Sequence, residues 1–467
     1  MTDTGAAMAV SAAPGRDLTG RLAELIAAAA FTDLGPDALR MTRLSLLDGL
    51  GVMLAATGIE PNTVAFASLA AGDGTGSCTV LGHGLRSSAP LAAFANGAAA
   101  HALDFEDTHD RALVHPNAAA IPALLALAES EGGVTGERFL LSLAVGCDVT
   151  CRLGLALRAD PMDRGWYPPP LLGALGATAA AAKLIGCDAA QICDALSMTL
   201  GQAAFSADIA RDPRSVLRGV RDAFPAKTAV LSALLAREGV RGVGDPLAGA
   251  AGFFQLFAGG RYEPAALFED WGERWAGASL SLKPWPSCRG THGAIQAAVE
   301  LAGTLDPADV AEIRVRAAPF LRMLVEPEEQ RYEPATAIDA KFSIPYCTAV
   351  ALSRGSVTLG DFAVLDDPEI RSLARMVRFE ADGGLTDGRA DLSVALRGGG
   401  SRSARVDRPY GGPLNPMSDD DVVRKFLDCA GRAAKPPAPA ALRRVVNMTL
   451  ALESVADVAA DLMPDLS

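Results

Sequence analysis

The spacing of apolar residues divides the chain into a long helical part and a shorter part of mixed character. Between Asp17 and Gly277, apolar positions recur at helical intervals in one segment after another. The predicted helices cover Asp37–Ala56, Leu91–Leu103, Ala118–Glu131, Gly136–Leu157, Leu171–Ile185 and Asp188–Phe205. The run ALGATAAAAKL in the fifth of these helices has few large side chains, which favours close contact with another helix. Asp188 is the predicted N-cap of the sixth helix.

After Gly277 the pattern changes to alternation of apolar and polar residues, which is typical of half-exposed strands. The predicted strands are Glu312–Ala317, Arg375–Glu380, Ala390–Leu396 and Ala404–Asp407, with helices at Thr291–Ala302 and Ser343–Arg354. This pattern predicts a smaller α+β domain over about Leu280–Tyr410. Two further helices, Ser418–Cys429 and Pro439–Leu450, follow it and are expected to return to the first domain.

Length and composition narrow the class of protein. The 467 residues favour two domains, and the abundance of alanine with only 5% aromatic residues favours packed helices. A net charge of -13 argues against nucleic acid or an anionic membrane as partner. Residues 1–16 are predicted to be a disordered leader without a secretory signal. Apolar runs such as Leu25–Phe31 are too short for a bilayer span, and eight scattered cysteines fit a cytoplasmic protein with reduced thiols.

Cofactor motifs are missing from the sequence. No G-x-G-x-x-G opens a helix, and no Walker loop, H-E-x-x-H, C-x-x-C or G-x-S-x-G is present. Cys288 and His292 are four residues apart and could share a helical face, but two ligands do not make a metal site. We therefore predict a protein that needs no metal, nucleotide or flavin.

Three of the five histidines fall in one short window, NGAAAHALDFEDTHDRALVHPN, which spans Asn96–Asn117. The same window holds Asp104, Glu106, Asp107 and Thr108. Histidine titrates near neutral pH and a carboxylate tunes it, so this composition favours proton transfer. The alternative is a helix end that runs into a solvated, capped loop.

Three other stretches carry candidate chemistry of weaker specificity. LKPWPSCRGTH offers Lys283, Arg289 and His292 on a proline-stiffened segment that could bind an anion, or could be a linker with solvated charges. Tyr167 stands in DRGWYPPP, where packing is the more common role. A run of cations is usually a solvated face; its members are Arg214, Arg218, Arg221 and Lys227.

At these motifs the sequence resembles the MmgE/PrpD family, whose members include dehydratases, a decarboxylase and an epimerase of small carboxylates. The resemblance covers nearly the whole chain after the leader. It is carried by ANGAAAHALDFEDTH, GALGATAAAAKLIG, KPWPSCRGTH, PATAIDAKFSIPYCTAVAL and GGPLNPMSDDDVVRKF. It implies a mostly α fold in which a large all-helical domain, residues 17–278 plus 412–467, carries an inserted α+β lid domain, residues 279–411. It also implies an active site between the two domains and a homodimer.

The family's functional positions carry over one at a time. The resemblance matches Asp104 and Thr108, with His101 just before them, and it matches His115 and the lid-edge Lys283. Three positions depart from the dehydratase and decarboxylase branches. Tyr167 and Cys288 stand where a histidine is usual, and Arg218 stands where a lysine is usual. Arginine binds carboxylates but is no base at neutral pH, so the resemblance implies a retained anion pocket with altered chemistry.

We therefore expect a cofactor-independent lyase that abstracts a proton α to a carboxylate of a small di- or tricarboxylate, as a dehydratase or decarboxylase does. An isomerase or epimerase with the same pocket is one alternative, and a non-catalytic carboxylate-binding homologue is another. The expected catalytic residues are His115, Asp104, Tyr167, Lys283 and His101. The expected substrate-binding residues are Thr108, Arg218, Arg289, Cys288 and His292.

Overall fold

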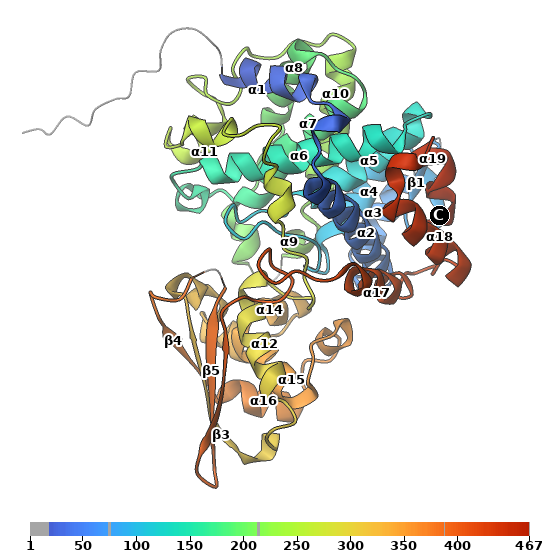
Figure 1. Ribbon diagram of the computed structural model, residues 1–467. Helices are drawn as coiled ribbons and strands as arrows, with labels where there is room; N and C mark the ends of the chain where they lie inside the picture. Colours follow the sequence, from blue (N-terminus) through green and yellow to red (C-terminus); the bar gives the residue numbers. More distant parts are fainter. Residues whose placement is uncertain (1–17, 73–75, 213–214, 387, 467) are drawn as a thin grey trace, which may run out of the picture.

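The computed structural model describes residues 18–72, 76–212, 215–386 and 388–466, and the predicted leader 1–16 lies outside them. A large helical body carries a smaller α+β part on one side (Figure 1). Each part has its own hydrophobic core. The larger core draws mainly on residues Leu22 to Leu282 and again on Met417 to Leu466. The second core draws on residues between Trp285 and Val406. The predicted fold class, mostly α with an inserted α+β region, is confirmed.

The helical body contains fourteen α-helices among the described residues, eleven before the lid and three after it. They are α1 Leu18–Ala28, α2 Pro36–Ile59, α3 Thr63–Ala71, α4 Ala89–His101, α5 Asn117–Glu131, α6 Gly136–Ala156, α7 Pro168–Leu184, α8 Ala189–Leu200, α9 Leu217–Val220, α10 Ala223–Arg237, α11 Phe253–Ala258, α17 Asp419–Ala430, α18 Pro439–Leu450 and α19 Val458–Asp461. Asp188 caps α8 as predicted, because its side chain accepts a hydrogen bond from the Gln191 amide.

The resemblance implied an all-helical domain, but the helical body also contains two strands. Two short strands, β1 Cys78–Val80 and β2 Leu85–Ser87, form an antiparallel hairpin. Gly82 and Gly84 adopt positive φ angles in its turn, a conformation that favours glycine. Strands of three residues are too short for alternation to reveal, so the hairpin escaped the sequence pattern.

Helices α6 and α7 pack closely through small residues, as the run ALGATAAAAKL predicted. A Cβ atom added to Gly176 would lie 1.8 Å from the Thr150 hydroxyl oxygen and 2.5 Å from the Gly146 carbonyl oxygen. A Cβ atom on Gly146 would in turn lie 2.6 Å from the Ala180 Cβ. The two helices therefore approach at a distance that only glycine permits at these positions.

The lid contains a four-stranded sheet and five α-helices among its described residues. The strands lie in the order β4-β3-β5-β6, with β3 and β4 parallel and the other neighbours antiparallel. The elements are α12 His292–Leu301, β3 Val310–Ala317, α13 Glu328–Tyr332, α14 Ala337–Lys341, α15 Ile344–Arg354, α16 Pro368–Arg375, β4 Val377–Ala381, β5 Ala390–Leu396 and β6 Ser401–Val406. Helix α12 packs on β5, β6 and α15.

Two predicted strands begin at the wrong residue. Arg375 is the last residue of α16 and not the start of a strand, because the amphipathic period of that helix continues to this position. Strand β6 begins at Ser401, where polar residues pair with β5, and ends before Asp407. The other two predicted strands agree with β3 and β5 to within two residues.

The chain leaves the helical body near Leu282 and returns near Gly411, and these two crossovers lie side by side. The Leu282 amide donates to the Gly411 carbonyl at 2.9 Å. Gly411 has a φ of 83°, and a Cβ there would lie 2.0 Å from the Leu282 carbonyl oxygen. After the return, α17 packs against α2 and the C-terminal helices rejoin the body (Figure 1).

Two helices, Pro36–Ile59 and Gly136–Ala156, are long and apolar enough to span a bilayer by length and composition. The length of these two helices differs from the expectation that apolar runs of this chain are too short to span a bilayer. In each helix more than four-fifths of the apolar window is buried inside the protein, at 83% and 89%. That degree of burial is what core helices of a helical domain show.

Candidate active site

The histidine- and carboxylate-rich window folds into a buried loop that follows α4. His101 ends the helix with no exposed surface, and the Asp104 amide closes a turn by donating to the His101 carbonyl at 2.8 Å. Asp104 has a φ of 50°, a left-handed conformation that aspartate tolerates better than most residues. This turn directs the side chains of Asp104 and Glu106 back toward His101. We call residues 102–108 the catalytic loop. His115 follows it just before α5.

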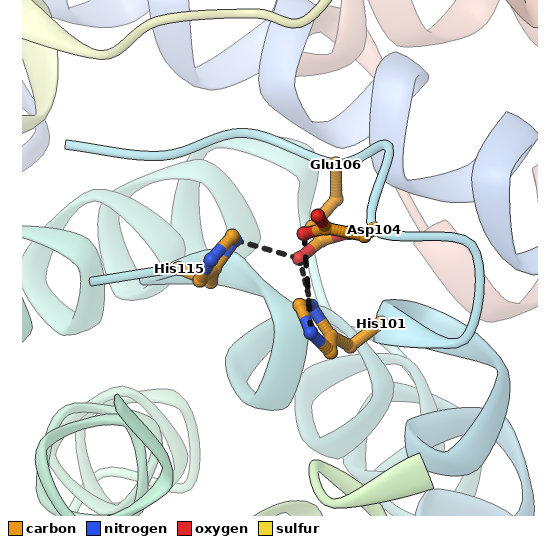
Figure 2. Close-up of side chains that lie close together, drawn as sticks. All are labelled: His101, Asp104, Glu106 and His115. Atoms are coloured by element: carbon orange, nitrogen blue, oxygen red, sulfur yellow. Dashed lines mark hydrogen bonds and ion pairs between the residues drawn. The ribbon is translucent and has the colours of Figure 1, made fainter. Parts of the chain in front are cut away.

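Glu106 bridges two histidines. Its Oε1 atom accepts a hydrogen bond from Nδ1 of His101 and lies 2.7 Å from Nδ1 of His115. The two imidazole rings meet edge to face with their centroids 4.7 Å apart. Figure 2 shows both rings turned toward the same carboxylate oxygen. Glu106 was noted in the sequence window but not selected as a site residue, because its position between the rings depends on the turn at Asp104.

The partners of His101 define its tautomer. Arg221 donates to Nε2 of His101, since a guanidinium can only donate, and a second guanidinium nitrogen lies farther away, at 3.4 Å from Nδ1. The shorter contact of Nδ1 is with the Glu106 carboxylate, which can only accept. Nε2 is therefore the unprotonated nitrogen, and the ring proton lies on Nδ1, where it is donated to Glu106. Burial, together with the charge of Arg221, lowers the pKa of His101 to about 3. His101 is thus a neutral relay that orients Glu106.

The partners of His115 leave its second nitrogen for chemistry. Nδ1 faces the Glu106 carboxylate and also lies 3.2 Å from the Asp107 carbonyl oxygen, and both of these groups are acceptors. The Nδ1 atom must therefore carry a proton. Within the described part of the chain no group hydrogen-bonds Nε2, and the side chain keeps 17% of its surface exposed. A carboxylate-oriented imidazole with a free nitrogen is the usual arrangement of a general acid or base.

The carboxylates of the site are held in their ionised forms. Burial alone would raise the pKa of Glu106, but the contacts with His101 and His115 and the charge of Lys283 hold it well below its usual range. Burial also opposes ionisation of Asp104. The charge of the nearby Lys283 ammonium outweighs the effect of burial, so the pKa of Asp104 is lowered. Nζ of Lys283 donates to the Asp104 carboxylate and to the Asp104 carbonyl, each at 2.7 Å. An ammonium has three N–H groups, and two of those of this fully buried lysine are used by Asp104.

Arg221 lies in the centre of the site, although the sequence pattern predicted a solvated face. Its exposed fraction is 1%, and the guanidinium contacts His101 and lies 3.4 Å from Asp222. Burial lowers its pKa, but the surrounding acidic groups, Tyr167 first among them, outweigh this and raise it. Arg218 is also buried, whereas Arg214 lies outside the described residues. The prediction failed because charge spacing alone does not reveal that α9 turns inward.

The three positions that depart from the family pattern lie around this cluster. The Tyr167 ring lies 5.4 Å from the Arg221 guanidinium carbon. The Arg218 guanidinium stacks 3.5 Å from the centroid of the Phe342 ring in the lid, and its Nε atom has no partner among the described residues. Burial raises the pKa of the Cys288 thiol to about 11, so the thiol is protonated near neutral pH. Cys288 therefore does not replace the acid–base capacity of a histidine.

Three predicted substrate-binding residues are used to hold the structure together. The Thr108 hydroxyl donates to the Val114 carbonyl at 3.0 Å. Arg289 joins the two crossovers by donating to the carbonyls of Pro409 and Tyr410 and to Asp110. His292 is buried between Arg289 and the Ser287 carbonyl, with its ring against Trp285. Each of the three residues therefore has structural partners, and its predicted role in substrate binding stays a prediction.

A metal ion is poorly suited to this cluster. The ligand atoms of His101, Asp104, Glu106 and His115 lie within 4.8 Å of one another, which is close enough for a cation. However, Arg221 already occupies Nε2 of His101, and Lys283 occupies Oδ1 of Asp104. A divalent ion would have to displace two buried cations from its own ligands. The residues present therefore fit proton transfer better than metal binding.

The helical body with its α+β insertion and buried acid–base cluster defines an enzyme-type architecture with a site next to the lid. The MmgE/PrpD N-terminal domain model matches residues 20–265, and the MmgE/PrpD C-terminal domain model matches residues 285–449. The chain belongs to the MmgE/PrpD family.

Curated relatives cover most of this chain. A cis-aconitate decarboxylase-like protein of Aspergillus oryzae is 27% identical over 95% of this chain and 96% of its own length. The cis-aconitate decarboxylase of Homo sapiens is 30% identical over 72% of this chain and 71% of its own. The cis-aconitate decarboxylase of Mus musculus is 28% identical over 88% of this chain and 86% of its own length.

Proposed function

We propose that the protein is a cofactor-independent lyase that removes carbon dioxide from a small tricarboxylate of the cis-aconitate type. The observation that carries the proposal is His115, whose Nδ1 is fixed by Glu106 while its Nε2 is free. The names of the similar proteins support the same reaction and substrate class. Dehydration of a related carboxylate would use the same groups.

The proposed reaction needs one proton and releases one molecule of carbon dioxide. His115, protonated on both nitrogens, donates the Nε2 proton to the alkene CH carbon, which is the alkene carbon not bonded to the methylene group. The C–C bond to the carboxylate on the methylene carbon breaks, and its electron pair forms the new double bond. Glu106 stabilises the imidazolium before transfer, and solvent returns the proton to Nε2 afterwards.

Buried cations supply the binding energy for the substrate carboxylates. Asp104 uses two of the three N–H groups of Lys283, and Arg218 has an unpartnered Nε next to the lid. Preplaced charges of this kind stabilise negative charge that develops beside the reacting carbon. In the proposal these two residues bind carboxylates, while Asp104 keeps Lys283 in place.

Epimerisation of a dicarboxylate is the second candidate, and the position of Tyr167 favours it. A tyrosine beside Arg221 could deliver a proton from a face other than that of His115. The non-catalytic alternative is less well supported, because Glu106, His101 and His115 form a complete relay. An epimerase would label its product with solvent hydrogen without releasing carbon dioxide.

Turnover in heavy water tests the proposal. Incubation with cis-aconitate should release carbon dioxide and give a product with deuterium at the carbon that was protonated. His115→Gln and Glu106→Gln should each lower kcat by at least about a hundredfold, since general acid–base catalysis contributes 10²–10⁴-fold. Glu129→Gln is the matched control and should leave kcat unchanged, because the Glu129 carboxylate lies on α5 and accepts hydrogen bonds from Thr79 of the β1–β2 hairpin. Product free of solvent deuterium would exclude the mechanism, and deuterium exchange without carbon dioxide release would favour the epimerase.

A further inference from the structure

Three lysine side chains donate to three successive carbonyl groups of the catalytic loop. Lys341 donates to the Leu103 carbonyl, Lys283 to the Asp104 carbonyl and Lys425 to the Phe105 carbonyl, each at 2.7 Å. The exposed fractions are 4%, 0% and 9%, so all three ammonium groups are buried. We call this set the lysine clamp.

The three lysines come from three separate parts of the fold. Lys283 lies on the first crossover, Lys341 ends α14 in the lid, and Lys425 lies on α17 after the chain has returned to the helical body. The clamp therefore joins the catalytic loop to the first crossover, to the lid and to α17 of the helical body. The loop carbonyls reach their geometry only when all three parts have packed.

Burying ammonium groups against neutral carbonyls is a costly way to stabilise a fold. A buried charge loses its hydration, and a single carbonyl restores only part of that free energy. The cost is visible at Lys341, whose pKa burial lowers to about 8 in spite of the attraction of Asp104. Lys425 recovers part of it from Asp48, whose Oδ1 atom lies 2.6 Å away. Lys283 recovers it from the Asp104 carboxylate at 2.7 Å, whereas Lys341 forms no ion pair among the described residues. The buried ammonium of Lys341 therefore points to a requirement of this particular loop.

The loop requires a fixed backbone geometry because it carries Asp104 and Glu106, the two carboxylates that contact the histidines and Lys283. Asp104 is the residue with positive φ, and Glu106 must reach two imidazole rings with a single oxygen atom. A small rotation of the peptides at residues 103–105 would move Glu106 away from Nδ1 of His115. Displacements of about 1 Å in a catalytic group can lower a rate by a factor of 10².

We propose that Lys341 and Lys425 are positioning residues of the reaction, which hold the catalytic loop so that Glu106 orients His115. The proposal rests on the proposed acid–base function of that pair. It extends the site to two lysines that do not touch the reacting groups, one of them on the lid. Through Lys341, correct packing of the lid becomes a condition for an active His115.

Lys341→Met is the main test, because Lys341 pairs with a neutral carbonyl and its removal leaves no opposite charge unpaired at that bond. Lys425→Met is made together with Asp48→Asn for the same reason. The matched control is Lys183→Met: Nζ of Lys183 also donates to two backbone carbonyls, Ala27 and Ala29, each at 2.7 Å, but away from the site. Lys341→Gln is a milder second variant in case the methionine variant does not fold.

The measurements are kcat and KM with cis-aconitate, and the NMR resonances of the Hε1 protons of His101 and His115, which need no substrate. We expect Lys341→Met to lower kcat by about ten- to a hundredfold with a much smaller change in KM, and to move the His115 resonance. Lys183→Met should leave kcat and both resonances as in the wild type.

The histidine resonances separate failure of this inference from failure of the proposed function. Unmoved resonances in both the Lys341 variant and the Lys425 double variant would overturn the clamp, whatever the enzyme turns over. Moved resonances with an unchanged kcat on a true substrate would also overturn it, because the loop would then be free to shift without consequence. If cis-aconitate is not a substrate, moved resonances in the Lys341 and Lys425 variants but not in Lys183→Met would still support the clamp.

Discussion

At the scale of single residues, the site depends on which atom of each histidine is left free. His101 has both nitrogens engaged, by Glu106 and Arg221, and so serves only to transmit orientation. His115 has one nitrogen engaged and one free. The two histidines thus differ in their contacts, and the difference is made by Arg221, which follows α9, and by the turn at Asp104. Sequence spacing cannot distinguish the two rings.

Asp107 gives a pH-dependent prediction at this scale. Burial raises its pKa to about 7, the charges of Asp48 and Glu106 add to this, and a hydrogen bond from Asn117 opposes it. A carboxyl whose pKa is higher in the folded state than in the unfolded state binds its proton more tightly when folded. Its contribution to stability is therefore lost as pH rises between about 4 and about 7.

In Asp107→Asn the side chain no longer titrates, so this pH-dependent contribution to the free energy of unfolding is absent. The free energy of unfolding of the variant, relative to the wild type, should rise between pH 5 and pH 7 by about 1.4 kcal/mol for each pH unit over which the two states differ fully in protonation. Urea unfolding of both proteins at pH 5, 6 and 7 measures the difference. A difference that stays the same at all three pH values would show that Asp107 is ionised in the folded protein throughout.

At the scale of elements, α6 and α7 make a close contact through small residues. Gly176→Ala would place a Cβ atom 1.8 Å from the Thr150 hydroxyl, so the two helices would have to separate. Overpacking of this kind typically costs about 1–3 kcal/mol. We expect a lower midpoint of thermal unfolding, whereas the control Gly244→Ala, where nothing lies within 4 Å of the added Cβ, should leave it nearly unchanged. Equal midpoints for the two variants would contradict the contact.

Much of the fold could be predicted from the sequence because most helices keep a strict apolar period. The eight predicted helices of the body and two of the four lid strands correspond to observed elements, although the predicted helix Asp188–Phe205 ends at Leu200. No range was predicted for α1, α3, α9, α10, α11 or α19. The β1–β2 hairpin could not be predicted, since three-residue strands carry too little pattern. In the site, the histidine window indicated the chemistry, but Arg221, Lys341 and Lys425 come from distant segments and contact it only after folding. Their burial depends on tertiary packing, which local charge patterns do not encode.

At the scale of the whole molecule, the acidic protein keeps a set of cations at the junction of its two parts. The net charge is -13, yet Lys283, Arg218, Arg221, Lys341 and Lys425 are all buried around one loop. The homodimer and the cytoplasmic location remain predictions from the resemblance and from composition.

These internal cations also bear on cofactors. Because Arg221 and Lys283 already occupy donor atoms of His101 and Asp104, we expect full activity after exhaustive dialysis against a strong chelator. The measurement is kcat/KM before and after treatment, with metal content determined in both samples. Activity that falls with the metal content and returns on addition of one particular ion would contradict this expectation.

The path of the chain through the lid has a consequence for biosynthesis. The loop between α4 and α5 emerges early from the ribosome, but its partner Lys425 lies on α17, which is synthesised only after the entire lid. Until then, Asp48 on α2 lacks the ammonium group that accompanies it in the finished protein. An unfinished or C-terminally shortened chain would therefore hold its histidines and carboxylates without the geometry to use them, and activity would begin only when translation is nearly complete.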